Sequence, residues 1–335
     1  MRTPRRTRAL LVGAVVVATV VLGACSEKKS PAILGGNGSE SHTISGLWWV
    51  MFALAAAVYA IVGSFILVAA FRGRGTRHGR PTRITPDGFI WVGGIIVPTL
   101  ILMTIAGFTV STTAAVRKPS SQALRIDVVG KRWWWAVDYP GLGIKTANEI
   151  HVPVGQPLSF KLTSDNVIHS FWVPQIAGKV DTIPGQNNYL NVTVRKAGTY
   201  RGLCAEYCGT QHANMQFLVI AQSPGDFGRW AARESILPPR DLTEEQARGQ
   251  FVFVNSACAG CHTIKDTQAQ GDVGPDLTDV GQRQTLGAAT IPNDTGHLSG
   301  WIANPQTVKP GNQMPPQSLS SSDLHAVVAY LQSLK

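Results

Sequence analysis

The sequence predicts a membrane-anchored, multidomain protein in which a two-helix transmembrane hairpin precedes an all-β sandwich and an all-α domain. Three features of the 335 residues support this fold class. Two long apolar runs lie in the N-terminal third, short apolar segments separated by Gly and Pro fill the middle, and a helical pattern begins at Thr243. Such changes of hydrophobic period along a chain indicate separate structural units.

The N-terminus has the features of a signal peptide. Four arginines lie within residues 1–8, and an apolar stretch follows over residues 9–24. The small residues before Cys25 resemble a bacterial lipoprotein signal, which implies cleavage of residues 1–24 and lipidation of the Cys25 thiol. An uncleaved helix with an incidental cysteine is the alternative. Residues 25–45 would then form an exported tether.

The hairpin is predicted over residues 46–111. Its two apolar runs, residues 47–71 and 89–110, each exceed the ~20 residues that a helix needs to cross a bilayer. The arginine-rich loop between them should remain in the cytoplasm. Everything after Val110 would therefore lie on the periplasmic or extracellular side of a bacterial cell membrane, anchored by two passes.

The positive charge of the chain belongs to this membrane region. Residues 1–118 contain 13 Lys and Arg against 3 Asp and Glu, whereas residues 119–335 contain 17 of each. The exported part thus has no basic excess of the kind that polyanion binding requires, which argues against a nucleic-acid partner.

Short strands are expected in residues 117–222. Gly and Pro clusters separate segments of apolar or alternating character, and this pattern predicts an antiparallel sandwich. The clearest strand candidates are residues 125–129, 158–163 and 189–194. A linker over residues 223–242 follows, with one helical turn expected near residues 227–233.

A helical domain is predicted over residues 243–335. Thr243 and Gln246 form a capping box ahead of one helix, and Ser320 and Asp323 can begin a terminal helix with an apolar face. The Gly- and Pro-rich loops between them are too long for a small core that stabilises itself. A large apolar group should therefore fill this domain.

A soft ligand set lies at the end of the predicted sandwich. Cys204, Cys208, His212 and Met215 fall within twelve residues, and His169 can reach them from a neighbouring strand. Two thiolates, imidazoles and a thioether favour copper over hard cations. The spacing fits neither a structural zinc finger nor a thioredoxin-like pair. A disulfide between the two cysteines would leave the histidine and methionine without a role.

Residues 45–230 resemble the dinuclear CuA subunit, subunit II, of cytochrome c oxidase, whose exported domain is a cupredoxin-like Greek-key sandwich. The resemblance implies that Cys204 and Cys208 bridge two copper ions. His169 and His212 would each bind one of the two ions. Asn166 stands where this family often has an aspartate.

The resemblance also assigns the surroundings of the copper ions. Met215 and the backbone carbonyl of Glu206 would be weak axial ligands, and the Glu206 side chain would face a Mg ion shared with subunit I. Trp133, in a cluster of three tryptophans, falls where the family takes electrons from its donor; a packed core aromatic is the alternative. Asp87 lies beside the position of a family glutamate that feeds a proton channel, although a solvated aspartate at a helix N-terminus is the simpler interpretation.

The helical domain contains a haem-attachment motif. Cys258 and Cys261 can bind haem c covalently, and His262 follows them as the proximal iron ligand. Met314, the only methionine of this domain, is the predicted second ligand, with His297 and His325 as rivals. Residues 243–335 resemble a small class I cytochrome c. The resemblance implies that the carbonyl of Pro275 accepts a hydrogen bond from the proximal histidine.

Two one-electron centres with closed coordination suit electron relay, and the chain shows no complete active site of its own. The resemblance implies a relay subunit of a haem–copper terminal oxidase. Electrons would pass from cytochrome c or another membrane donor through haem c and CuA to subunit I, where oxygen is reduced to water with proton translocation. The partners of this chain would be subunits I and III and membrane lipid. Alternatives are the CuA subunit of a nitric oxide reductase and a copper-delivery or assembly protein.

The two exported domains carry opposite charge. Residues 119–240 contain 12 basic and 8 acidic residues, and residues 241–335 contain 5 and 9. We therefore expect opposite signs to help dock the cytochrome domain on the copper domain near Trp133.

Overall fold

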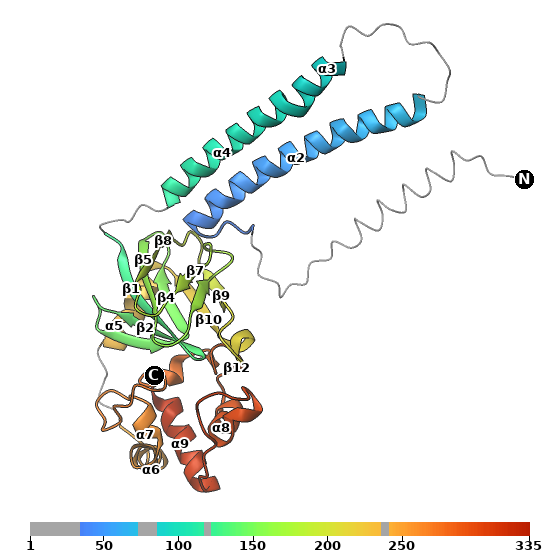
Figure 1. Ribbon diagram of the computed structural model, residues 1–335. Helices are drawn as coiled ribbons and strands as arrows, with labels where there is room; N and C mark the ends of the chain where they lie inside the picture. Colours follow the sequence, from blue (N-terminus) through green and yellow to red (C-terminus); the bar gives the residue numbers. More distant parts are fainter. Residues whose placement is uncertain (1–33, 73–85, 117–121, 236–240) are drawn as a thin grey trace, which may run out of the picture. The chain divides into compact units, whose positions relative to one another are not determined.

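The computed structural model describes residues 34–72, 86–116, 122–235 and 241–335, all within one compact unit, Ile33–Lys335. The predicted signal peptide and Cys25 lie outside the described residues. The hairpin, the sandwich and the helical domain of the predicted fold class are confirmed, and Figure 1 labels their elements.

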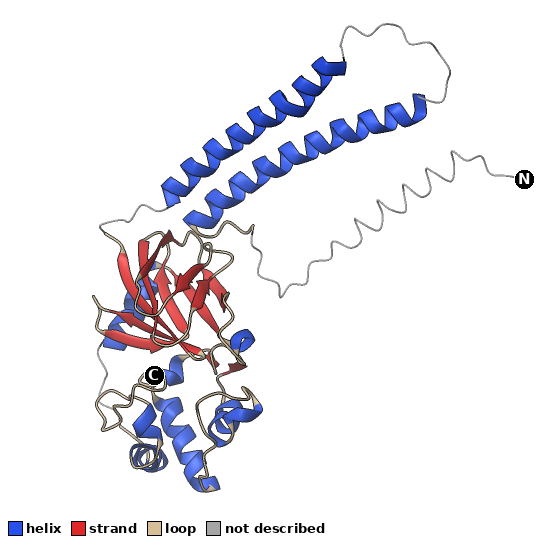
Figure 2. Ribbon diagram, viewed as in Figure 1, coloured by secondary structure: helices blue, strands red, loops and turns tan. Residues whose placement is uncertain are grey.

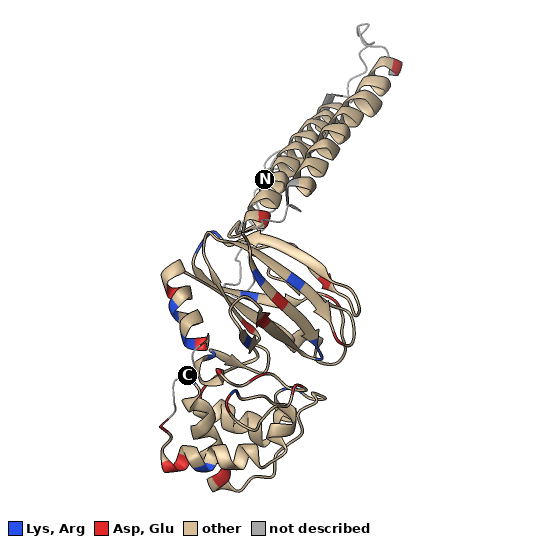
Figure 3. Ribbon diagram, turned by 90° about the vertical axis from the view of Figure 1, so that its left-hand side faces the viewer, with Lys and Arg blue, Asp and Glu red and all other residues tan. Residues whose placement is uncertain are grey.

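Two helices form the hairpin. The first is α2 (Ser39–Arg72), and the second is continuous through α3 (Pro86–Phe89), the π-helical η1 (Ile90–Ile96) and α4 (Val97–Val116). The apolar spans of 33 and 28 residues are long enough to cross a membrane. Figure 3 shows charged residues only near the ends of their described parts. Their side chains are largely exposed, as a lipid-facing or partner-facing hairpin requires.

Helix α2 begins at Ser39, before the predicted start at residue 46. Its first turn is held by the sandwich: Ser39 Oγ accepts a hydrogen bond from Thr193 N at 3.0 Å, and Ser41 Oγ donates to Gln175 O at 2.9 Å. These contacts extend the helix through a polar stretch that hydropathy does not identify.

Ten strands build the sandwich (Figure 2). One sheet has the order β3-β2-β1-β5-β8 and the other β4-β10-β9-β6-β7. The strands are β1 (Leu124–Lys131), β2 (Trp134–Tyr139), β3 (Ile144–Ala147), β4 (Glu149–Pro153), β5 (Pro157–Ser164), β6 (His169–Trp172), β7 (Val180–Thr182), β8 (Asn188–Thr193), β9 (Gly198–Cys204) and β10 (Gln216–Gln222).

The sandwich is mainly antiparallel, as predicted, but two of its strand pairings are parallel. Strand β1 pairs in parallel with β5, and β10 pairs in parallel with β4. Both are crossover pairings between strands that are distant in sequence, and they join antiparallel hairpins in the manner of a Greek key. A pattern of alternating residues indicates which face of a strand is buried, but not the direction of its neighbour.

Aromatic rings fill the space between the sheets. Trp135, Phe171 and Phe217 have centroids 4.4–5.7 Å apart, and all three are buried. Gly202 makes this packing possible, because a Cβ there would lie 2.2 Å from the Phe217 ring. The resulting rigid core lies next to the strand ends that carry the predicted copper ligands.

Helix α5 (Pro224–Ser235) replaces the single turn expected in the linker. It buries Phe227, Trp230, Ala231 and Glu234 at helical spacing, and the Trp230 ring stacks on His151 at 4.4 Å. The helix is therefore part of the copper domain and stabilises the outer face of β4.

The helical domain contains α6 (Glu244–Val254), α7 (Cys258–Cys261), η3 (Val280–Gln282), β11 (Thr285–Leu286), β12 (Ile291–Pro292), α8 (Thr295–Ala303), η4 (Pro305–Thr307) and α9 (Ser321–Ser333). The predicted capping box of Thr243 with Gln246 is present, and Ser320 caps α9. Helices α6 and α9 cross at Gly249, where a Cβ would lie 2.0 Å from the Ala326 carbonyl oxygen.

Candidate copper and haem sites

The sandwich brings the five predicted copper-binding side chains together at one end. His169 begins β6 and Cys204 ends β9. Cys204 pairs with Phe171, so His169, two residues along β6, lies on the same face of the sheet as Cys204. Cys208 and His212 lie in the connecting loop, which contains η2 (His212–Asn214), and Met215 directly precedes β10. The local β9–β10 hairpin thus folds the sequence motif into one cluster.

The donor atoms form two groups, one around each sulfur. Cys204 Sγ lies 3.9 Å from His169 Nδ1 and 3.2 Å from the Glu206 carbonyl oxygen. Cys208 Sγ lies 3.6 Å from His212 Nδ1 and 3.8 Å from Met215 Sδ. Each thiol therefore has one imidazole and one weaker donor.

The two sulfurs are 3.8 Å apart and both cysteines are free, so the structure contains no disulfide between Cys204 and Cys208. Their contact lowers the pKa of Cys204, to about 3, and raises that of Cys208. The pair thus holds a thiolate readily, which is the form that binds metal. A largely buried, soft donor set of this kind fits copper.

His169 is oriented by a polar neighbour. Its Nε2 lies 3.1 Å from Asn166 Oδ1, and the side chain is fully buried. When Nε2–H donates to this oxygen, Nδ1 carries the lone pair and faces Cys204. Asn166 therefore performs the orienting role without the negative charge of an aspartate.

Trp133 is attached to the copper loop. Its indole Nε1 donates to the Cys208 carbonyl at 2.8 Å. A Cβ on Gly209 would lie 3.1 Å from the indole, and Gly209 has φ +113°, so glycine allows this close approach. Trp133 also lines the cavity of the helical domain.

That cavity contains all four predicted haem-binding residues, Cys258, Cys261, His262 and Met314. Its other walls are mainly apolar and come from α6, α8, α9 and the loops between them. The apolar lining residues include Phe253, Leu277, Val280, Leu286, Leu298, Trp301, Ile302, Val327 and Leu331. The cavity is thus shaped for the large apolar group that the sequence requires.

The proximal histidine is held as predicted. His262 Nδ1 lies 2.8 Å from the Pro275 carbonyl, which leaves Nε2 for a metal, and burial lowers the pKa of this imidazole. Gly274 is required here because a Cβ would lie 2.5 Å from the ring. His297 is half-exposed beside Asp294, and His325 is exposed; neither lines the cavity.

Two other predicted residues are less enclosed. The Glu206 side chain is half-exposed, with Lys179 Nζ 3.8 Å from its carboxylate. Asp87 is exposed in the first turn of α3. Neither carboxylate belongs to a cluster of metal-binding side chains within the described part of the chain, so their roles stay predictions.

Family profiles and relatives agree with this arrangement. The profile for the periplasmic domain of cytochrome c oxidase subunit II matches residues 142–222, and that for cytochrome c matches residues 246–335. A cytochrome c oxidase subunit 2 from Alkalihalophilus pseudofirmus is 32% identical over 293 residues, covering 85% of this chain and 84% of the relative. The chain belongs to the cytochrome c oxidase subunit 2 family.

Two further similarities are to subunits of the same kind of oxidase. A cytochrome bo(3) ubiquinol oxidase subunit 2 from Pseudomonas putida is 28% identical over 212 residues, covering 59% of this chain and 66% of the relative. The crystal structure of the periplasmic domain of cytochrome oxidase subunit II from Bradyrhizobium japonicum is 29% identical, with a TM-score of 0.33, and covers 36% of this chain and 96% of that one.

Membership makes this chain a subunit of a haem–copper oxidase, an oxidoreductase complex in which subunit I is its partner. The two matched domains imply copper and haem as cofactors. The apolar helices and the periplasmic-domain match indicate a membrane anchor with the copper domain outside.

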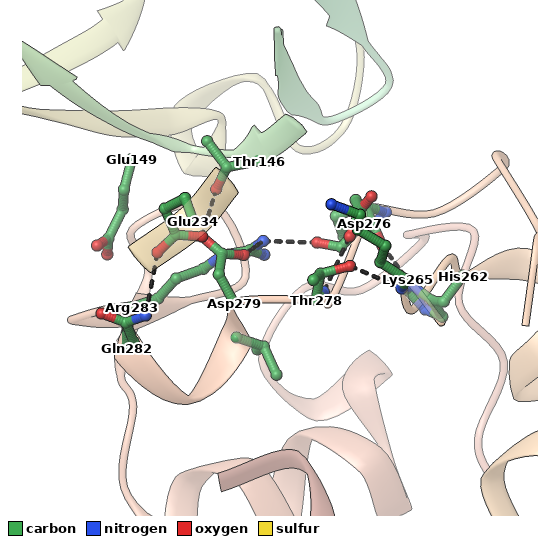
Figure 4. A network of polar contacts seen from close by, with 12 residues as sticks. Thr146, Glu149, Glu234, His262, Lys265, Asp276, Thr278, Asp279, Gln282 and Arg283 are labelled. Carbon is green, nitrogen blue, oxygen red and sulfur yellow. Dashed lines mark hydrogen bonds and ion pairs between the residues drawn. The ribbon is translucent and has the colours of Figure 1, made fainter. Parts of the chain in front are cut away.

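The copper and cytochrome domains share a buried polar contact (Figure 4). Glu149 on β4 accepts hydrogen bonds from Gln284 N at 3.0 Å and from Thr285 N and Oγ1 at 2.9 and 2.7 Å. Thr146 Oγ1 donates to Asp279 Oδ2 at 2.8 Å. These partners join residues more than 130 positions apart, so no local sequence signal identifies them.

The same contact shows which charged groups lie between the two domains, whose opposite net charges we expect to help docking. Among the described residues, no ion pair joins the segment 122–235 to the segment 241–335. Arg283 instead pairs with Asp279 inside the cytochrome domain, and Gln282 Nε2 donates to Glu234 at 3.0 Å. Burial, followed by the nearby Asp279 charge, raises the pKa of Glu234 to about 7. Hydrogen bonds therefore join the described parts of the two domains, and the help expected from their opposite net charges stays a prediction.

Proposed function

We propose that this chain receives electrons from cytochrome c at its own haem c and passes them through dinuclear CuA to subunit I. There oxygen is reduced to water with proton translocation. The observation that carries the proposal is the position of Trp133, which lines the cavity containing His262 and also donates a hydrogen bond to the Cys208 carbonyl. One side chain thus connects the haem cavity with a copper ligand.

The copper-binding residues suit rapid one-electron transfer. Cys204 and Cys208 would bridge the two ions, His169 and His212 would each bind one, and Met215 with the Glu206 carbonyl would be the weak axial ligands. All but His212 and Glu206 are buried in the described structure. Because strand pairing and the aromatic core restrain these side chains, a change of charge should move them little.

The haem-binding residues have the same character. Cys258 and Cys261 would hold the haem covalently, while His262 and Met314 would bind its iron. The group supplies one-electron chemistry when bound, and two protein ligands leave no position for substrate. The chain therefore relays electrons, and the oxygen chemistry belongs to subunit I.

We also propose a processed N-terminus and contacts with the other subunits. Residues 1–24 would be removed as a lipoprotein-type signal, and Cys25 would carry lipid. The Glu206 carboxylate, half-exposed at the copper loop, would face a Mg ion shared with subunit I. Subunit III would be a further partner, and Asp87 would lie where protons reach subunit I.

Metal content and electron paramagnetic resonance of the purified oxidase test this proposal. We expect one covalent haem c and two copper ions on this chain, with hyperfine splitting shared equally between the two coppers. A single exchangeable copper with ordinary splitting would contradict the relay and favour a copper-delivery protein. The CuA subunit of a nitric oxide reductase would give the same spectrum, so turnover with oxygen and with nitric oxide separates that alternative.

A further inference from the structure

Lys309 is a buried cation at the contact between the two domains. Only 3% of its surface is exposed, and its ammonium group donates to three backbone carbonyls. The acceptors are Trp133 O at 3.0 Å, Asn214 O at 2.9 Å and Gly287 O at 3.1 Å. Three acceptors match the three hydrogens of an ammonium group.

These carbonyls belong to the parts of the relay that must lie close together. Trp133 connects the haem cavity with the copper loop, and Asn214 lies between the copper ligands His212 and Met215. Gly287 belongs to the cytochrome domain and lines the haem cavity. Lys309, itself in the cytochrome domain, therefore joins that domain to Trp133 and to the copper loop beside the cofactor-binding residues.

Burying this cation has a cost that the three carbonyls must offset. Burial lowers the pKa of Lys309 to about 7, and none of the ion pairs among the described residues includes it. A buried charge is costly unless hydrogen bonds satisfy it, so the three carbonyls must keep their places around the ammonium group.

The loop after Lys309 extends this contact to the haem ligand. Gln211 Nε2, in the copper loop, donates to the Pro310 carbonyl at 2.6 Å. At the other end, Asn312 Oδ1 accepts from Met314 N at 2.8 Å, and Gln306 Nε2 donates to Met314 O at 2.9 Å. Residues 309–314 thus hold the copper loop at one end and the axial methionine at the other.

We propose that Lys309 is a positioning residue for electron transfer within the chain, because it fixes the distance and orientation of the haem-ligand loop relative to Trp133 and the copper loop. This inference rests on the proposed relay from haem c to CuA. Lys309 makes no contact with either metal ion in this role. It acts through the backbone of Trp133, Asn214 and Gly287, which lie beside the metal-binding residues.

The test uses the complete oxidase with Lys309→Met, and Lys265→Met as the matched control. Lys265 is an exposed lysine of the same domain, and its side chain makes no hydrogen bond or ion pair in the described structure. After rapid reduction of haem c, the rate of CuA reduction is followed optically. Dipolar coupling between the haem and CuA electron spins reports the distance between them.

We expect Lys309→Met to slow the transfer about tenfold or more, since small misplacements of reacting groups can cost that much. The spin–spin distance should broaden or lengthen, while the haem spectrum and CuA hyperfine splitting stay unchanged. Lys309→Gln, which retains two donor hydrogens, should give an intermediate rate and decides the question if the methionine variant does not assemble. Lys265→Met should transfer at the wild-type rate.

Wild-type rates and an unchanged spin–spin distance in the Lys309 variants would overturn the inference. Loss of the haem or CuA spectrum in Lys309→Gln would also overturn it, because the residue would then maintain a metal site directly. Absence of haem-to-copper transfer in the wild-type oxidase would instead contradict the proposed relay. The two failures are therefore distinguishable.

Discussion

Replacing Glu149 with alanine should loosen the cytochrome domain from the copper domain. The carboxylate is 2% exposed, and it accepts three hydrogen bonds from Gln284 and Thr285 at 2.7–3.0 Å. All the donors belong to the cytochrome domain and the acceptor belongs to β4. The contribution of this contact therefore appears in the coupling between the domains.

The expected size follows from the donors that the change leaves unsatisfied. Two main-chain N–H groups lose their acceptor, at about 1–3 kcal/mol each when they stay buried. Part of this loss is recovered, because burial raises the pKa of Glu149 and its removal relieves that desolvation. We expect a net loss of roughly 2–4 kcal/mol from the free energy of unfolding of the cytochrome domain.

Guanidinium unfolding of the solubilised oxidase, followed by two signals, measures this change. Haem absorbance reports the cytochrome domain and CuA absorbance reports the sandwich. In the variant, the haem transition should move to lower denaturant while the CuA transition moves less. Glu245→Ala, at an exposed position on α6, serves as the control. Equal stability of Glu149→Ala and the control, within about 0.5 kcal/mol, would refute the reasoning.

Three further predictions follow from single contacts. Gly249→Ala should destabilise the cytochrome domain by about 1–3 kcal/mol in the same haem-detected unfolding, because the added Cβ meets the backbone of α9. The control Gly300→Ala should be neutral or slightly stabilising, because the space around Gly300 is open. Burial and Asp279 raise the pKa of Glu234 to about 7, so the folded chain binds a proton on this carboxyl more tightly than the unfolded chain does. The free energy of unfolding should therefore fall as pH rises from about 4.3 to about 7. Glu234→Gln should flatten that decline in unfolding titrations at pH 5 and 8; an unchanged decline would exclude Glu234 as its source. Cys208→Ser should abolish the shared copper hyperfine pattern yet retain covalent haem, and an intact pattern would remove Cys208 from the bridging role.

The site residues were predictable where the chemistry is local in the sequence. Cys204, Cys208, His212 and Met215 lie in one short loop, and the haem motif is contiguous at Cys258–Cys261. Residue type and spacing alone therefore indicate their chemistry. His169 required a neighbouring strand, which the β6–β9 pairing provides.

The contact between the domains was not predictable in this way. Lys309 lies between Val308 and Pro310 and resembles any surface lysine, and Glu149 resembles an ordinary strand carboxylate. Their roles depend on partners more than 90 residues away, such as Asn214 for Lys309 and Thr285 for Glu149. Net charge suggested that opposite signs help dock the two domains, but it carries no information about which groups become buried.

The central claim is that haem c reduces CuA within one chain. The most direct measurement is rapid photoreduction of haem c in the wild-type oxidase, with haem oxidation and CuA reduction followed together. We expect equal rates for both signals, independent of protein concentration. The rates should also be nearly independent of ionic strength, since no ion pair joins the described parts of the two domains. Reduction of CuA before the haem, or a rate that rises with protein concentration, would contradict it.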